Sequence, residues 1–150
     1  MSVTEKIKQG LGEKVVDWNR YSPRRVYVTI RPEDLKEAAL FLFKTCGLRL
    51  CIATGTDTPE SIEISYHFSS DETGEIFSLR VHLTDKDNPE LDSLTDVTTG
   101  ANWIEREMWE LLGVNFVGHP KLERLLLNED WPEGKYPLRN TPDEQGELYG

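Results

Sequence analysis

The chain has 150 residues, and its 27 aspartates and glutamates exceed its 17 lysines and arginines, which gives a formal charge of −10. Its longest apolar run, residues 38–43, is far shorter than the roughly 18–20 residues of a membrane-spanning helix. The acidic balance argues against nucleic acid, whose phosphates are bound by clustered lysines and arginines, and the first residues show no apolar segment of a signal peptide. We therefore expect one compact acidic domain that does not span a membrane, is not secreted and does not bind nucleic acid.

The first 22 residues are predicted to form a short helix or a loose arm. Apolar residues recur at helical spacing from Ile7 to Trp18, although two glycines interrupt them. Residues 25–30 then alternate between polar and apolar, which is typical of a strand. This part of the chain is therefore expected to supply an arm and the first strand of the domain.

A helix is predicted next, with Pro32 in its first turn and Gly47 as the left-handed residue that ends it. Three further strands are expected after this helix, and the last two are joined as a hairpin: residues 48–53, 61–68 and 75–83. Residues 54–57 are interpreted as the turn that leaves the first of these three strands.

These elements predict an α+β domain of two layers, in which a mixed or antiparallel sheet of about four to five strands is packed by two or three helices. We divide the chain into an N-terminal arm or short helix (1–22), the α+β domain (23–127) and an extended C-terminal arm (128–150). The C-terminal arm shows no sustained period, and its six acidic residues against two basic ones give it a net charge of −4. Its isolated anchors favour an embracing contact with a partner subunit, with a disordered tail as the alternative: Trp131, Tyr136 and Leu138.

Residues 103–112 are the most informative segment and are predicted to form an amphipathic helix that ends at Gly113. Its polar side carries Trp103, Arg106, Glu107 and Glu110. An indole on the polar side of a helix is hard to explain as part of a core, and tryptophan is enriched at the energetic centres of protein interfaces.

Glu105 is the exception on this helix, because it lies at the margin of the apolar face, where an unpaired carboxylate would cost several kcal/mol. We interpret it as part of a capping box with Asn102 as the N-cap. Docking on a partner through Glu107 and Glu110 is the second interpretation. Catalysis by Glu105 and Glu107 is disfavoured, because residues two apart on a helix point to different faces.

His119 lies between Gly118 and Pro120, where we expect it to orient a loop or to cap a short helix that begins at Pro120. Two other histidines, His67 and His82, are predicted to lie opposite the apolar faces of their strands.

The sequence shows no phosphate-binding loop, nucleophile elbow or metal-ligand cluster, so we expect no active site of its own. Cys46 and Cys51 are interpreted as small, half-buried thiols. The alternative kept open is a free-standing metal-binding module in which Cys46, Cys51 and the histidines are the ligands.

One run of residues resembles a known family. The chain has Glu105-Arg106-Glu107 on a helix, then Gly-x-x-Phe-x-Gly-His-Pro-x-Leu at 113–122, and Arg124 before an aliphatic pair. This pattern is similar to the signature of the thirty-kilodalton subunit family of respiratory complex I (NADH dehydrogenase), which includes the corresponding small subunit of membrane-bound, energy-converting nickel–iron hydrogenases. The resemblance covers roughly residues 24–139. The short chain and its divergent end favour the hydrogenase type.

The resemblance implies a non-catalytic structural subunit of the hydrophilic, peripheral arm of such an oxidoreductase, cytoplasmic and associated with the membrane through the complex. It implies no cofactor in this chain, and iron–sulfur clusters, with nickel–iron or quinone as further candidates, in the partner subunits. The implied partners are a large, hydrogenase-like subunit and a small iron–sulfur subunit. The residues expected at the interface or in the motif are Trp103, Glu105, Arg106, Glu107, Glu110, Gly118, His119, Pro120, Arg124, Trp131, Leu138 and Arg139.

Overall fold

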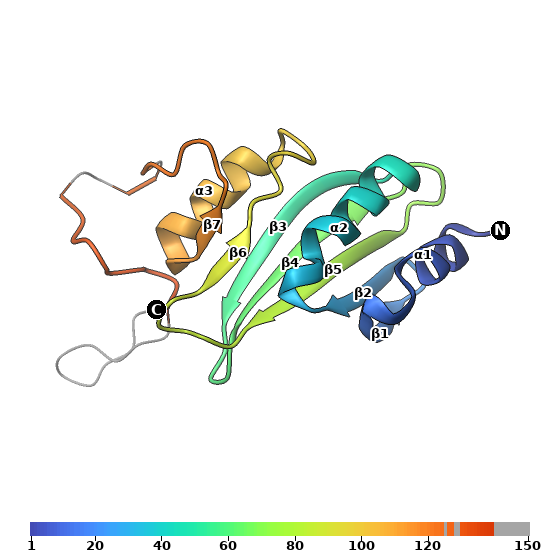
Figure 1. Ribbon diagram of the computed structural model, residues 1–150, viewed down its shortest axis with the longest axis horizontal. Helices are drawn as coiled ribbons and strands as arrows, with labels where there is room; N and C mark the ends of the chain where they lie inside the picture. The colour runs from blue at the N-terminus through green and yellow to red at the C-terminus, as the bar shows by residue number, and fades with distance from the viewer. Residues whose placement is uncertain (125, 128–129, 140–150) are drawn as a thin grey trace.

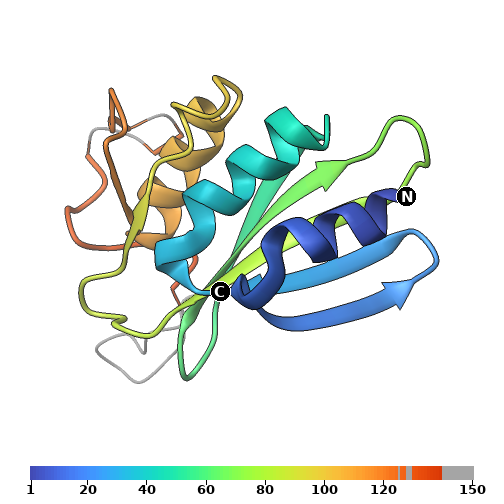
Figure 2. The same ribbon diagram turned by 45° about the vertical axis from the view of Figure 1, so that its right-hand side comes forward.

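The structure is a computed structural model, and it describes residues 1–124, 126–127 and 130–139. A five-stranded sheet in the order β1-β2-β5-β4-β3 forms one layer (Figure 1). Its strands are β1 (Val15–Ser22), β2 (Arg25–Ile30), β3 (Arg49–Asp57), β4 (Ile62–Ser69) and β5 (Ile76–Leu83). The helices form the second layer, on one face of the sheet (Figure 2): α1 (Val3–Leu11), α2 (Leu35–Leu40) and α3 (Ala101–Leu112).

The sheet is mixed, because β2 and β5 pair in parallel while the other neighbouring strands are antiparallel. Two short strands, β6 (Glu90–Asp92) and β7 (Asn115–Val117), form a separate parallel pair. The predicted α+β fold with a mixed sheet packed by helices is confirmed.

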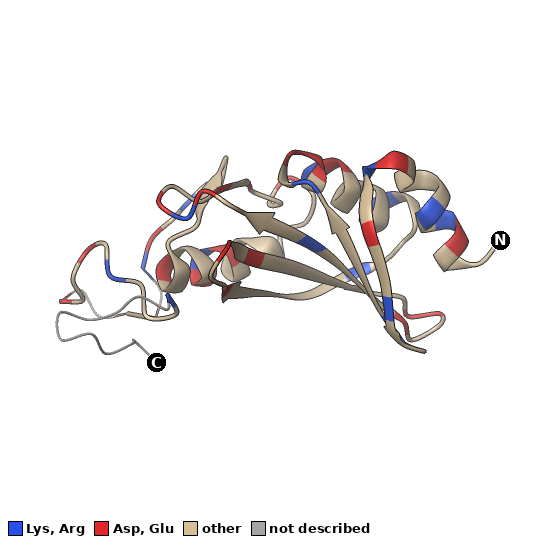
Figure 3. Cartoon of the chain, turned by 90° about the horizontal axis from the view of Figure 1, so that it is seen from below, with Lys and Arg blue, Asp and Glu red and all other residues tan. Residues whose placement is uncertain are grey.

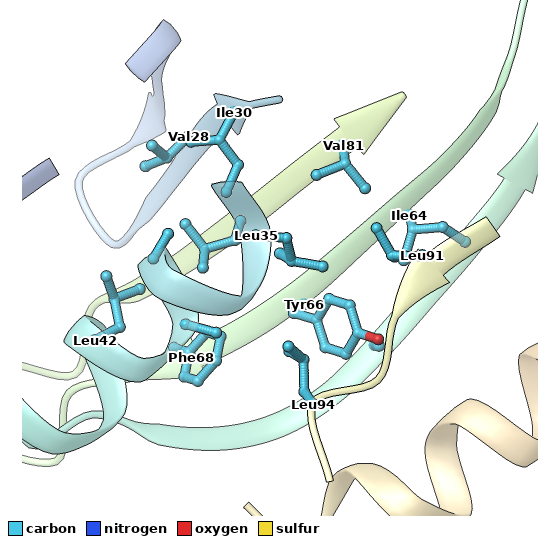
Figure 4. Packing of buried hydrophobic residues seen from close by; sticks show 14 of the residues in the cluster. Val28, Ile30, Leu35, Leu42, Ile64, Tyr66, Phe68, Val81, Leu91 and Leu94 are labelled. Atoms are coloured by element: carbon cyan, nitrogen blue, oxygen red, sulfur yellow. The ribbon is translucent and has the colours of Figure 1, made fainter. Parts of the chain in front are cut away.

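The buried core lies between α2 and the sheet. Alternate residues of the strands point toward this helix, among them Ile64, Tyr66 and Phe68 of β4, all fully buried (Figure 4). Leu91 and Leu94, which follow the loop after β5, cover the same side of the sheet beyond α2. Buried side chains of all three helices belong to this one core.

The N-terminal segment differs from the expected arm or single helix. Helix α1 ends at Leu11, and Val15 and Trp18 lie in β1, where they pair with Ile30 and Val28. The helical interpretation of these two residues was wrong, because Gly12 turns the chain with a φ of +54° and a strand begins after it. The division at residue 22 stays a prediction.

The predicted helix after β2 begins with a 3₁₀ turn at Pro32–Asp34, continues as α2 and closes with a π turn at Phe41–Thr45. Gly47 ends it with a φ of +68°, as expected. The predicted turn at 54–57 was wrong, because β3 continues to Asp57 and pairs there with Ile62. The short helix expected from Pro120 was also wrong, since the described residues of 120–127 form no helix.

Gly55 lets α3 approach β3 closely, and its replacement by alanine is expected to lower the free energy of unfolding by about 1–3 kcal/mol. The added Cβ would lie 2.3 Å from Cδ1 of Leu112 and 3.2 Å from Cδ1 of Ile64. Both of these side chains are buried, so neither can move aside freely. Urea unfolding of the purified chain measures the change.

The matched control is the same substitution in a Leu112→Ala background, where the closest of the two contacts is absent and Gly55→Ala should cost less than in the wild type. A rise in stability from Gly55→Ala alone would show that α3 does not lie this close to β3.

Candidate functional site: helix α3 and the C-terminal segment

Helix α3 is placed by two glycines and by its apolar side. It begins after Gly100 without a side-chain cap, and it ends at Gly113, whose φ is +78°. The expected capping box of Asn102 and Glu105 was therefore wrong, because Asn102 already lies inside the helix. Met108 and Leu112 point from α3 toward Gly55 of β3.

Glu105 is fully buried and joins α3 to the sheet and to the chain after β6. Its carboxylate accepts hydrogen bonds from the Tyr66 hydroxyl (2.8 Å), the Ser93 hydroxyl (2.6 Å) and the Leu94 backbone N–H (2.8 Å). Burial raises the pKa of Glu105, and these hydrogen bonds lower it by less. Three donors on two other segments therefore supply the partner that a carboxylate at this position needs.

The outer side of α3 remains exposed at Trp103, whose surface is 57% accessible. Glu107 lies one turn further and is half-buried, and among the described residues it makes no hydrogen bond or ion pair. Arg106 is half-buried, and its Nε donates to the Glu123 backbone oxygen at 3.4 Å. This side of the helix thus presents an indole and a carboxylate to solvent.

His119 ties the chain after β7 to the start of α3. Its Nε2 donates to the Asn102 backbone oxygen (2.9 Å), and its Nδ1 accepts from the Lys121 backbone N–H (3.0 Å). Because one partner can only accept and the other can only donate, these bonds specify the neutral tautomer with the proton on Nε2. His119 therefore orients this loop, one of the two roles expected of it.

Glu110 is 3% exposed and holds the chain's own backbone. Its carboxylate accepts from the Leu126 N–H, with a shorter distance of 2.8 Å, and from the Leu127 N–H at 2.6 Å. A carboxylate that accepts hydrogen bonds from two successive backbone amides is held firmly in one position. The outward position on the polar side that sequence periodicity indicated is thus covered by the C-terminal segment.

The end of α3 is covered by residues 136–139, which we call the clasp. The Leu138 N–H donates to the Leu111 oxygen (3.0 Å), and Arg139 Nη1 donates to the Leu112 oxygen (3.4 Å). Helix ends leave such carbonyls without intrahelical donors, so the clasp caps the helix. The Tyr136 ring lies against Gly113, where an added Cβ would approach it to 2.5 Å.

Between the clasp and the middle of α3 the surface is hollowed by about 300 Å³. Three aromatic side chains are among its lining residues and offer apolar surface to a hydrophobic group: Trp109, Trp131 and Tyr136. Trp131 is 37% exposed, and its Nε1 donates to the Lys135 oxygen at 2.7 Å. Leu138 is 47% exposed.

Asp57 is a buried charge that the sequence interpretation assigned to a turn. Its side chain is 2% exposed, and it forms ion pairs with Lys86 Nζ (2.6 Å) and Arg139 Nε (3.6 Å). An aspartate at the end of an alternating run is usually a turn residue, so the sequence carried no signal for this cluster. Of the remaining motif residues, Gly118 and Pro120 are exposed and Arg124 is half-buried.

The metal-binding alternative finds no support in the described part of the chain, where no three His, Cys, Asp or Glu side chains are close enough to share an ion. Cys46 is half-buried, Cys51 is exposed, and both thiols are free. Burial raises the pKa of the Cys46 thiol. His67 instead contacts hydroxyls, with Nδ1 2.6 Å from Ser78 Oγ and Nε2 3.0 Å from Thr54 Oγ1.

Residues 28–147 match the protein family described as "Respiratory-chain NADH dehydrogenase, 30 Kd subunit". The fold therefore defines a class of protein: an α+β domain that carries the sequence motif on helix α3 and has a C-terminal segment packed over that helix. The chain belongs to this 30 Kd subunit family of the respiratory-chain NADH dehydrogenase. Across the described ranges, no helix is both long and apolar enough to cross a lipid bilayer.

Relatives of known assignment come from several kinds of complex. The C subunit of the F(420)H(2) dehydrogenase of Methanosarcina mazei is 33% identical over 141 residues, which are 92% of this chain and 85% of the relative. The beta subunit of the membrane-bound hydrogenase of Pyrococcus furiosus is 34% identical over 150 residues, covering 96% and 85%. The C/D subunit of the NADH-quinone oxidoreductase of Bacteroides thetaiotaomicron is 36% identical over 113 residues, or 72% of this chain, and the match spans only 21% of that longer protein.

Two solved structures share the fold. A chain of the membrane-bound sulfane sulfur reductase, an archaeal respiratory membrane complex, superposes with a TM-score of 0.80 at 23% identity, covering 91% of this chain and 81% of that one. A trypsin-resistant fragment of Nqo5 superposes with a TM-score of 0.68 at 26% identity, covering 81% of this chain and all of the fragment. These likenesses agree with the α+β architecture described above.

Proposed function

We propose that this chain is a non-catalytic structural subunit of a complex I-like or hydrogenase-type respiratory complex, and that it docks on the large, hydrogenase-like subunit. The observation that carries the proposal is the family match over residues 28–147. Its relatives include subunits of an F(420)H(2) dehydrogenase and of a membrane-bound hydrogenase. Electron transfer then belongs to iron–sulfur clusters, with nickel–iron or quinone sites as further candidates, in the partner subunits.

The docking surface that we propose is the exposed side of α3 together with the described part of the C-terminal segment, residues 130–139. Trp103 and Glu107 offer an indole beside a free carboxylate, and Trp131 and Leu138 add apolar surface near the other end of the helix. Tryptophan in such a position is typical of an interface centre. Figure 3 shows that acidic residues recur along the chain, and with the formal charge of −10 this favours a basic surface on the partner.

Glu105 and Glu110 serve the chain itself in this proposal. Both are buried and hold other parts of the same chain, so they shape the docking surface without contacting the partner. The membrane association that we propose is indirect, through the complex, on the cytoplasmic side.

Co-purification from native membranes tests the assignment. A tagged chain should recover a large subunit and an iron–sulfur subunit in stoichiometric amounts under mild detergent. Recovery of the chain alone from gently solubilised membranes would contradict the proposal.

Metal analysis of the isolated chain separates the two functions considered, because stoichiometric zinc or iron bound to it would favour the metal-binding module. The genes next to the one that encodes this chain would show whether its partners handle a nicotinamide and quinone, or hydrogen.

A further inference from the structure

Asp57 joins three segments that are far apart in the sequence. It ends β3 with a side chain that is 2% exposed, and two cations from different segments reach it: Lys86 Nζ at 2.6 Å and Arg139 Nε at 3.6 Å. Lys86 Nζ also donates to the Thr58 oxygen, so the lysine is held to the turn after β3 in its own right. Of the two cations that contact Asp57, Arg139 is therefore the one that lies in the clasp.

The other contacts of Arg139 bring the cluster to α3. Its Nη2 donates to the Lys86 oxygen at 2.9 Å, and its Nη1 donates to the Leu112 oxygen at 3.4 Å. One residue earlier, the Leu138 N–H donates to the Leu111 oxygen at 3.0 Å. A single guanidinium therefore connects the buried carboxylate, the loop after β5 and the end of the helix.

We propose that Asp57 is a positioning residue for the docking surface: by holding Arg139 it closes the clasp on α3 and fixes where Leu138 is presented, and with it Trp131, whose Nε1 donates to the oxygen of Lys135 next to the clasp. The role in docking rests on the proposed function, whereas closure of the clasp is a property of the isolated chain. The negative charge is the essential part. Without it, Lys86 and Arg139, with side chains 26% and 15% exposed, would face each other with their charges uncompensated.

Hydrogen exchange of the full-length chain tests closure of the clasp. In Asp57→Asn, the Leu138 amide should exchange at least about tenfold faster than in the wild type, because a partly buried charged contact no longer holds the clasp. Trypsin should cleave the Lys135–Tyr136 bond faster by a similar factor. Amides in the middle of β5 should keep their wild-type rates. The matched control is Asp85→Asn, which removes an exposed carboxylate from the loop after β5 and should change neither readout.

Arg139→Gln keeps the inference testable if Asp57→Asn does not fold, because it removes the clasp side of the same pair. It should accelerate the Leu138 amide as Asp57→Asn does, and the double variant should add little to either single one. Asp57→Glu keeps the negative charge, so the Leu138 amide should be better protected from exchange in this variant than in Asp57→Asn. The proposal would be overturned if the Leu138 amide exchanged at its wild-type rate in both single variants. It would also be overturned if that amide exchanged faster only by the same factor as the β5 amides.

Association with the purified partner complex then tests the positioning role. Asp57→Asn should weaken binding by about tenfold, in parallel with opening of the clasp. An open clasp with unchanged binding would overturn the positioning role. Failure of the wild-type chain to bind would instead count against the proposed function, and the exchange result would stand by itself.

Discussion

Replacing Glu105 by alanine is expected to lower the free energy of unfolding of the isolated chain by about 3–5 kcal/mol. The substitution leaves the Tyr66 hydroxyl, the Ser93 hydroxyl and the Leu94 N–H without their acceptor, and it opens a cavity beneath α3. Domains of this kind are stable by about 5–15 kcal/mol, so a large part of the total is at stake. Urea unfolding followed by far-ultraviolet circular dichroism measures the change.

Glu107→Ala is the matched control. It removes a half-buried carboxylate from the same helix, and this carboxylate accepts no hydrogen bond from the described residues. Its effect on unfolding should stay within about 0.5 kcal/mol. Equal effects of the two substitutions would show that the hydrogen bonds of Glu105 do not stabilise the fold.

Glu105→Gln separates the charge from the shape of the side chain. Because the pKa of Glu105 is raised in the folded chain, mainly by burial, the folded state binds the proton more tightly than the unfolded state does. The pH-dependent part of this group's contribution to stability is therefore complete below its unfolded pKa and is lost as the pH rises through the folded pKa. The wild type should accordingly exceed Glu105→Gln in stability most at acidic pH, and the difference should shrink toward neutral pH. A difference that grows toward neutral pH would contradict this assignment.

Trp103→Ala is expected to weaken association with the partner complex by about 2 kcal/mol or more, which is about thirtyfold in Kd. The indole is 57% exposed in the isolated chain, so its removal should change the free energy of unfolding by less than about 0.5 kcal/mol. Titration calorimetry with the purified partner complex, paired with urea unfolding of the same variant, measures both quantities.

The control for Trp103 is Tyr21→Ala, which removes an aromatic side chain, 72% exposed on β1, from the opposite edge of the sheet. This variant should bind as the wild type does. Adding Glu107→Lys to Trp103→Ala should weaken binding further if the partner surface is basic. Loss of the fold in Trp103→Ala, or unchanged binding, would remove this side of α3 from the interface.

Periodicity predicted the strands and the helices where the local pattern and the tertiary structure agree. The alternating runs at 25–30 and 75–83 became β2 and β5 almost residue for residue. The pattern failed where two interpretations shared the same spacing: Val15 and Trp18 continue the helical stripe of Ile7 and Leu11, yet Gly12 ends the helix and places them in a strand.

The candidate site was less accessible to sequence reasoning, because its main contacts are made between distant segments. The need of Glu105 for a partner could be inferred from its place on the helix, but Tyr66 lies 39 residues away and no local pattern points to it. Glu110 was expected on the polar side of α3, and only its contacts with the Leu126 and Leu127 amides show that it is covered there. Periodicity describes one element at a time and carries no information on what covers it.

The one parallel pairing in the main sheet has a consequence for the order of folding. The antiparallel pairs β1–β2 and β3–β4–β5 each join neighbouring segments, whereas β2 and β5 bring together residues about fifty positions apart, beginning with Arg25 and Ile76. Closing a loop of that length costs more chain entropy than closing a hairpin, and non-local pairing slows folding. The two antiparallel units should therefore form first, and the seam between β2 and β5 should be completed last, when α2 and the core side chains close over it.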